Sequence, residues 1–187
     1  MVESSERGRS GSLSALLAGL QAGMSGVLWM LAWLGASAAW HRLTFWTPEN
    51  LMASAFDRDA ALRADFCGAT ISGFALYLLL YSTLGALFAL AVGERLSRAH
   101  TALAGMLFGL CWYFLSYHAI WRSLMPLEAL LHPERPTAIG HLVYGAVLGR
   151  FPAYLQRGAE TATAPLPEAE AQAGGPVAPE MPPERPE

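Results

Sequence analysis

Long apolar stretches alternate with short polar segments along the chain, and this pattern predicts membrane-spanning helices. Crossing about 30 Å of hydrocarbon takes about 20 residues at about 1.5 Å per residue. Three stretches reach that length without an acidic or arginine side chain: residues 13–40, 66–93 and 99–121. A fourth, residues 138–155, is interrupted by Arg150 and Pro152. We expect it to cross as well, because arginine can extend its charged end to the headgroups.

These spans predict an all-α membrane protein whose four-transmembrane-helix bundle covers residues 13–156. Residues 1–12 precede it as a cytoplasmic tail. In the first outer loop, Thr47-Pro48-Glu49 is typical of a helix start, with Thr47 as N-cap and proline at the first helical position. We interpret this segment as a short interfacial helix that lies at the membrane surface.

The segment from residue 157 to 187 has a different composition. Alanine, glutamate, glycine and proline dominate it, and it contains no aromatic residue. Such a segment cannot bury enough apolar surface to offset the entropy of ordering it. The sequence therefore predicts a disordered, acidic and proline-rich C-terminal tail.

Composition supports the membrane assignment and excludes one class of partner. The residues are 53% apolar and 14% charged, whereas soluble domains average about 25% charged residues. The sequence has no lysine and no basic patch with interleaved aromatic residues, so nucleic acid is not an expected partner. The lipid bilayer is the expected partner instead, with other membrane subunits or a second copy of the chain in a homo-oligomer.

Arginine placement indicates the orientation. If the N-terminus lies inside, the inner side is slightly richer in arginine: Arg7, Arg9, Arg95, Arg98, Arg150 and Arg157, against Arg42, Arg58, Arg63, Arg122 and Arg135. The short inner loop between the second and third spans is dense in arginine, which favours the inside. We expect a multi-pass protein of the cell inner membrane with both termini in the cytoplasm.

Small residues spaced one helical turn apart predict close helix packing. Lipid tails are as apolar as leucine, so helices in a membrane associate through close backbone contact. Three of the spans carry a GxxxG pair: Gly19 and Gly23, Gly105 and Gly109, and Gly145 and Gly149. The remaining span has a ladder of alanine and glycine residues, and together these patterns predict a compact bundle.

Histidines gather at the outer membrane face in this topology, where they are candidate ligands. His118 ends the third span and His141 begins the fourth, so the two lie at similar depth. At about 100° per residue, His141 shares a stripe with Gly145 and Gly149 and points into a packed interface. Two hypotheses remain open: His118 and His141 bind haem b or a metal between facing helices, or they form hydrogen bonds between helices.

Other ligand and catalytic groupings are less well supported. His41 and His132 lie in the same outer region and are candidate metal ligands, His132 together with Glu128 and Glu134. Cys67 and Cys111 lie in apolar stretches and indicate two buried thiols. No acidic residue lies at mid-membrane depth, as pumps and proton-coupled transporters generally need. Ser116 and the histidines lack a nucleophile elbow or an HExxH context, so the sequence favours a protein that is not an enzyme.

The fourth span carries a family resemblance. The segment His141-Leu142-Val143-Tyr144-Gly145-Ala146-Val147-Leu148-Gly149 follows a proline-bearing loop. It resembles the final helix of small uncharacterised bacterial polytopic inner-membrane proteins, which reads H-x-x-Y-G-x-x-x-G. The opening span, with Ala18-Gly19 and Gly23, is similar to theirs. The resemblance implies a polytopic bacterial membrane protein and carries over no catalytic residue.

We therefore hypothesise a non-enzymatic accessory, assembly or scaffold subunit of a membrane complex, for which no cofactor is expected. The alternative is a redox subunit that binds haem or a metal through the outer-face histidines. A second alternative is a small transporter or channel component, which needs a continuous polar path.

Overall fold

The computed structural model describes residues 2–93, 96–124, 131 and 133–163, and no strand occurs among them. The elements are α1 (Val2–Trp40), α2 (Thr47–Ala53), the 3₁₀-helix η1 (Arg58–Leu62), α3 (Gly68–Val92), α4 (Arg98–Phe114), the π-helix η2 (Leu115–Trp121), α5 (Arg122–Leu124), α7 (Glu134–Leu148) and α8 (Phe151–Thr163). The prediction of an all-helical protein is confirmed for this part of the chain.

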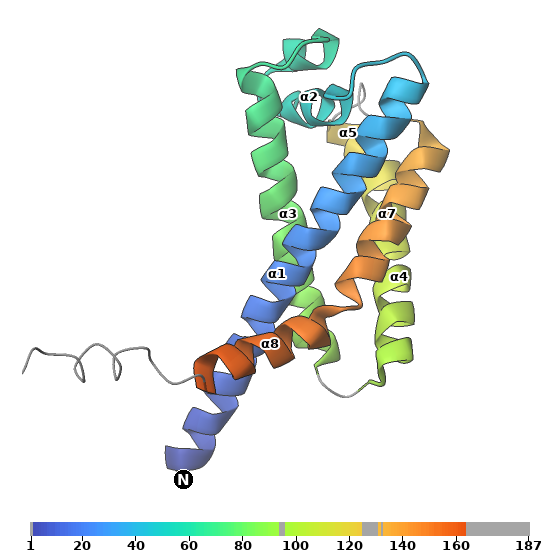
Figure 1. Ribbon diagram of the computed structural model, residues 1–187. Coiled ribbons are helices and arrows are strands. Elements are labelled where there is room, and N and C mark those ends of the chain that lie inside the picture. Colours follow the sequence, from blue (N-terminus) through green and yellow to red (C-terminus); the bar gives the residue numbers. More distant parts are fainter. Residues whose placement is uncertain (1, 94–95, 125–130, 132, 164–187) are drawn as a thin grey trace, which may run out of the picture.

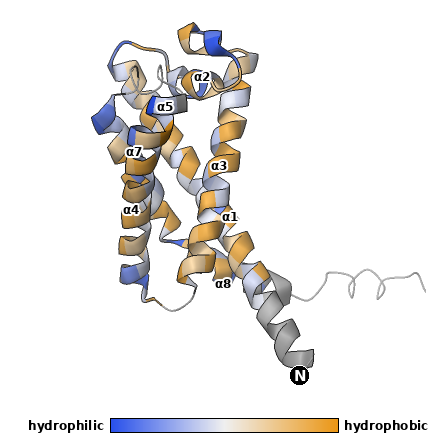
Figure 2. Cartoon of the chain, turned by 180° about the vertical axis from the view of Figure 1, so that it is seen from behind, coloured by the Kyte–Doolittle hydropathy of each residue, from blue (hydrophilic) through white to orange (hydrophobic). Residues whose placement is uncertain are grey.

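Three helices are long and apolar enough to cross a membrane: Gly11–Trp40, Gly68–Val92 and Arg98–Trp121. Many of their large apolar side chains face outward, among them Trp29 at 65%, Leu79 at 68% and Leu107 at 55% exposure. Figure 2 shows the hydrophobic colouring along these helices and hydrophilic segments toward their ends. Apolar surface of this extent is suited to lipid rather than to water.

Helix α1 is the longest element and begins at Val2, so residues 2–12 extend the first helix. It ends in a Schellman motif, in which the Leu43 N–H donates to the Ala38 carbonyl and the Arg42 N–H to the Ala39 carbonyl. Arg42 has a positive φ of 63°. This left-handed residue turns the chain back toward α2.

Helix α2 was predicted at the right place, but it begins one residue earlier than its capping pattern suggested. Trp46 is the N-cap, and the Thr47 hydroxyl lies 3.2 Å from the Thr44 hydroxyl instead of capping the helix. Six consecutive residues from Pro48 to Ala53 are buried. The helix therefore packs into the protein against α3 and α1 instead of presenting an exposed polar face.

The fourth predicted span, residues 138–155, is wrong as a continuous helix. Helix α7 ends at Leu148 and α8 begins at Phe151 after a turn at Gly149 and Arg150. Pro152 explains the break, because it has no N–H to donate to the Leu148 carbonyl and its ring would clash there. Helix α8 then continues to Thr163, so the predicted tail starts too early, and residues 164–187 lie outside the described residues.

The helices pack in a chain of neighbours: α3 against α1, α1 against α7, and α7 against α4. Figure 1 shows α2 at the same end of the molecule as the last turns of α1, and α8 running across α1 near the opposite end. We call these the α2 end and the α8 end. The core between the helices contains α1 side chains such as Val27 and Met30 together with Tyr77, Tyr81 and Tyr144.

Both cysteines were predicted to be buried, and that prediction is wrong. Cys67 is half-buried at the start of α3, and Cys111 is exposed on α4. Apolar sequence context does not distinguish a side chain that faces other helices from one that faces outward.

Candidate functional site

His141 is fully buried and uses both ring nitrogens in hydrogen bonds, one of which joins α7 to α3. Its Nε2 lies 2.8 Å from the Tyr81 hydroxyl, and its Nδ1 lies 2.8 Å from the Thr137 carbonyl oxygen. A carbonyl oxygen only accepts, so Nδ1 carries the proton and donates. In the neutral ring Nε2 is then the acceptor, and the Tyr81 hydroxyl donates to it. Both ring nitrogens are thus engaged within the protein.

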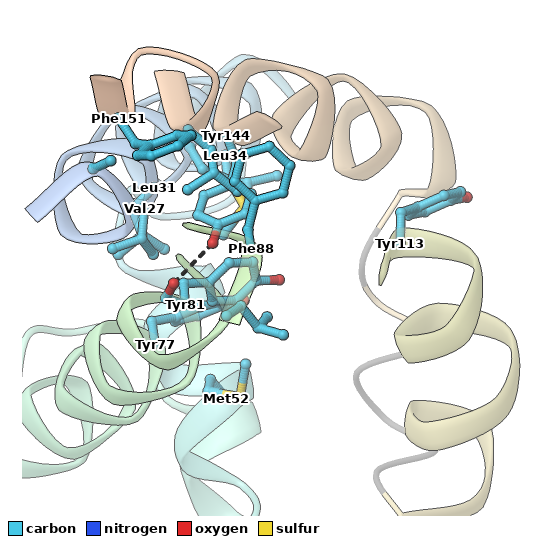
Figure 3. Packing of buried hydrophobic residues seen from close by; sticks show 14 of the residues in the cluster. Val27, Leu31, Leu34, Met52, Tyr77, Tyr81, Phe88, Tyr113, Tyr144 and Phe151 are labelled. Carbon is cyan, nitrogen blue, oxygen red and sulfur yellow. Dashed lines mark hydrogen bonds between the residues drawn. The ribbon is translucent and has the colours of Figure 1, made fainter. Parts of the chain in front are cut away.

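Two tyrosines complete this polar contact between α3 and α7. The Tyr144 hydroxyl donates to the Tyr81 carbonyl at 2.8 Å, the contact that Figure 3 marks with a dashed line. The Tyr81 and Tyr144 rings meet edge to face with centroids 4.9 Å apart. Edge-to-face contacts between aromatic rings add to the stability of a buried cluster.

His118 also contacts the ring of Tyr113 but lies in a different environment. The Tyr113 ring is 5.5 Å from the ring of His141 and 5.9 Å from that of His118. His118 stacks on Phe114, an exposed side chain, and its Nε2 is 3.8 Å from a Glu134 carboxylate oxygen. The structure therefore brings the two histidines to one aromatic neighbour, with His141 inside the interface and His118 near its outer edge.

A π-helix accounts for part of the arrangement around His118. From Leu115 to Trp121 the turns widen, and Ser116, Tyr117 and Trp121 are all buried. The direction in which the His118 side chain points therefore does not follow from about 100° per residue along α4. Nothing in the apolar sequence of this region signals the change of helix type.

The structure describes only some of the other predicted metal ligands. His41 is exposed beyond α1, and His132 and Glu128 lie outside the described residues. Within the described ranges, no group of three histidine, cysteine, aspartate or glutamate side chains could hold a metal ion. His100 is at the α8 end, where its Nδ1 lies 2.6 Å from the Ser97 hydroxyl.

The glycines of the first span lie where α1 crosses α3. A Cβ added to Gly19 would lie 2.6 Å from the Gly85 carbonyl oxygen, and one added to Gly23 would lie 2.6 Å from the Tyr81 carbonyl oxygen. These are backbone atoms that cannot easily move. The two helices therefore touch through their main chains, and Gly85 supplies the matching surface on α3.

The glycines of the third and fourth spans lie against each other where α4 crosses α7. A Cβ on Gly105 would lie 2.9 Å from the Gly149 nitrogen, and one on Gly109 would lie 3.3 Å from the Gly145 Cα. A Cβ on Gly145 would in turn lie 2.8 Å from the Cα of Met106. The structure thus places the six predicted packing glycines at two helix crossings.

A cavity of about 410 Å³ lies beneath α2, between α1 and α3. We call it the α2 cavity. It is lined by apolar and aromatic side chains together with the polar residues Glu49 and Thr70: Leu28, Leu31, Ala32, Phe45, Trp46, Glu49, Phe66, Thr70, Ile71 and Phe74. Mostly apolar cavities of this size with a few polar groups are typical of small-molecule sites.

The polar floor of this cavity is not among the sites that the sequence predicted. Glu49 is 3% exposed although the sequence predicted it on a helix at the membrane surface, and Thr70 is 1% exposed. Gly73 allows this burial, because a Cβ there would collide with the Glu49 carbonyl of α2. The available signal was a polar side chain near the start of each helix, Asn50 in α2 and Thr70 in α3. In the structure the Thr70 hydroxyl donates a hydrogen bond to the Asn50 side chain at 2.6 Å.

Comparison with known proteins adds a family and no function. Residues 13–163 match the sequence model of one protein family, described as Family of unknown function (DUF6789). No curated protein matches the chain, and no solved structure matches it.

Proposed function

The chain belongs to DUF6789, a family of unknown function, and from its geometry we propose a non-enzymatic accessory, assembly or scaffold subunit of a membrane complex. The observation that carries the proposal is the use of the buried polar groups. His141 binds Tyr81 of α3 through one ring nitrogen and the Thr137 carbonyl of its own helix through the other, and the glycine faces hold the helix backbones together. Groups committed to joining helices build a stable scaffold and are not available to a substrate.

The finer architecture within this proposal is a four-helix transmembrane bundle, with α7 as the fourth crossing. Fifteen residues make α7 about 22 Å long at about 1.5 Å per residue, shorter than the hydrocarbon layer. Nevertheless, Glu134 at the start of α7 lies near His118, and Gly149 just after its end lies beside the Thr101 carbonyl of α4. Helix α7 therefore runs beside most of α4. A locally thinner bilayer accommodates the difference between the length of α7 and the thickness of the hydrocarbon layer.

The same proposal gives α2 and α8 places at the two membrane boundaries. Helix α8 has Phe151 and Leu155 turned toward the protein and Gln156, Arg157 and Glu160 exposed. Such an amphipathic helix is suited to the surface of a bilayer. With four crossings the start of α1 and the whole of α8 lie on the same side, and the arginines near that side support its assignment to the cytoplasmic face of a bacterial inner membrane.

Partner capture from native membranes tests the subunit role. The full chain carries an affinity tag inserted after Thr163 and is expressed at its natural level. It is extracted in mild detergent, and the mass of the extracted assembly is measured. We expect an assembly larger than the detergent-bound monomer, with a second protein in fixed stoichiometry or a homo-oligomer. A monomer with no stoichiometric companion, extracted from cells in which it is made normally, overturns the proposal.

Haem or metal binding is the rival proposal, and it is favoured by the shared contact of His118 and His141 with Tyr113. Ligation through His141 requires one of its two hydrogen bonds to be given up. An absorption spectrum and a metal assay of purified protein decide between the two proposals. A Soret band that disappears in His141→Gln supports haem, whereas a colourless, metal-free protein supports the scaffold.

A further inference from the structure

We propose that a cavity where α4, α7 and α8 meet binds the phosphate headgroup of an anionic phospholipid. The cavity has a volume of about 340 Å³, and we call it the α8-end cavity. Two arginines and four smaller residues line it: Arg98, Arg150, Ala102, Gly149, Pro152 and Ala153. The proposal rests on the membrane boundary that the proposed architecture places at the α8 end, and it does not depend on a protein partner.

The crossing of α4 and α7 brings the two arginines to this cavity. Gly149 lies directly against α4, because a Cβ added to it would collide with the Ala102 Cα. Arg150 follows Gly149 in the chain, and Arg98 lies one turn before Ala102 on the same face of α4. The two positive charges therefore reach the cavity from two separate segments of the protein.

The charges around the cavity favour an anion. Both arginines are exposed, and neither forms an ion pair or a side-chain hydrogen bond in the part of the chain that the structure describes. Helices α4 and α8 both begin at the cavity, and neither has an acidic residue in its first turn. The N-terminal end of a helix carries a partial positive charge, which adds to that of the arginines.

The surroundings of the cavity favour a lipid over a free phosphate. Arg98 begins one of the helices that are long and apolar enough to cross a membrane, Arg98–Trp121. Leu103 and Met106 follow in its next turns and are 56% and 36% exposed. A phosphate that carries acyl chains gains contact with this apolar surface as well as with the arginines, whereas a free phosphate gains only the second. Basic pockets between membrane helices on the cytoplasmic side are suited to lipid headgroups for this reason.

Native mass spectrometry of the purified full-length protein counts bound lipids and tests the proposal. The protein in an uncharged detergent is titrated with phosphatidylglycerol, or with phosphatidylcholine that has the same acyl chains. Both lipids carry a phosphate, but the choline group cancels its charge. We expect one saturable phosphatidylglycerol molecule per chain. Its affinity should be about 5-fold above that of phosphatidylcholine, the size of one charge interaction at a membrane surface.

Charge variants separate the cavity from the net charge of the protein. Arg98→Gln and Arg150→Gln should each lower the affinity for phosphatidylglycerol about 5-fold and reduce its preference over phosphatidylcholine. Arg58→Gln is the matched control, because it removes the same charge from an exposed position of η1 at the α2 end. We expect this control to leave the affinity unchanged.

A size variant tests the cavity without a change of charge. Ala153→Phe fills the cavity and should abolish the saturable site, whereas Gln156→Phe, at an exposed position of α8 outside the cavity, should not. Each variant is used only if its thermal midpoint without added lipid matches that of the parent protein. The comparison of the two lipids on the parent protein needs no variant and tests the proposal in every case.

Three results overturn the proposal. Equal affinities for phosphatidylglycerol and phosphatidylcholine show that the arginines do not select an anionic headgroup. A loss of affinity in Arg58→Gln equal to that in Arg98→Gln shows that the lipid responds to net charge and not to the cavity. Displacement of the lipid by an equal concentration of glycerol phosphate shows that a soluble phosphate compound fills the cavity. Lipid binding is measured on purified protein and partner capture measures assembly, so failure of one proposal is distinguishable from failure of the other.

Discussion

Replacing Tyr81 with phenylalanine isolates the hydrogen bond from its hydroxyl to His141, one of two that join α3 to α7. Tyr81 and His141 are both 0% exposed, and the Tyr81 hydroxyl lies 2.8 Å from His141 Nε2. The substitution keeps the ring and removes only the donor. His141 cannot compensate by moving its proton, because Nδ1 would then turn a lone pair toward the Thr137 carbonyl oxygen.

The magnitude follows from the unsatisfied nitrogen. A buried acceptor left without its partner costs about 1 to 3 kcal/mol. Measured hydrogen bonds between membrane helices average about 0.6 kcal/mol and reach about 1.7 kcal/mol, because the unfolded helices also find partners in the membrane. We therefore expect Tyr81→Phe to lower the free energy of unfolding by about 1 to 1.5 kcal/mol.

The assay is equilibrium unfolding in mixed micelles, in a double-mutant cycle with His141→Leu. The coupling energy of the pair should be about 1 kcal/mol. Tyr144→Phe is the matched control, because the Tyr81 carbonyl that it leaves behind still accepts the helical N–H four residues on. A Tyr81→Phe cost that stays the same in the His141→Leu background refutes the assigned bond.

Three further predictions follow from the helix contacts and ends. Gly145→Ala forces a Cβ against the backbone of α4 and should destabilise the protein by about 1 to 3 kcal/mol in the same unfolding assay, whereas Gly158→Ala, with open space around it, should not. Arg42→Gly removes the cost of a left-handed residue and should raise the unfolding free energy by about 1 kcal/mol; a lower value contradicts the Schellman end of α1. A membrane-impermeant maleimide should label Cys67 from one side of the membrane only and leave Cys111 unlabelled, because Cys111 faces outward from the middle of an apolar helix. Equal labelling of both cysteines contradicts the placement of α4 in the lipid.

Local pattern was sufficient to predict the three long apolar helices and the glycines at the helix crossings. In a membrane, the backbone N–H and C=O groups of an apolar run of about 20 residues need hydrogen-bond partners, and a helix supplies these partners within the run itself. The positions of Gly19, Gly23, Gly105 and Gly109 were likewise visible, because one helical turn separates the members of each pair. These properties depend on residues close in sequence.

Only the tertiary structure decided which faces meet and what each polar group does. Gly19 and Gly23 lie against Gly85, and Gly105 lies against Gly145, pairings that no local pattern distinguishes from other combinations. His141 was a candidate ligand by sequence, and its partner Tyr81 stands 60 residues away. Glu49 was predicted on a helix at the membrane surface, yet the approach of α2 to α3 buries it. Burial and hydrogen bonding are set by contacts between distant segments, and periodicity within one segment carries no information about the neighbour it will meet.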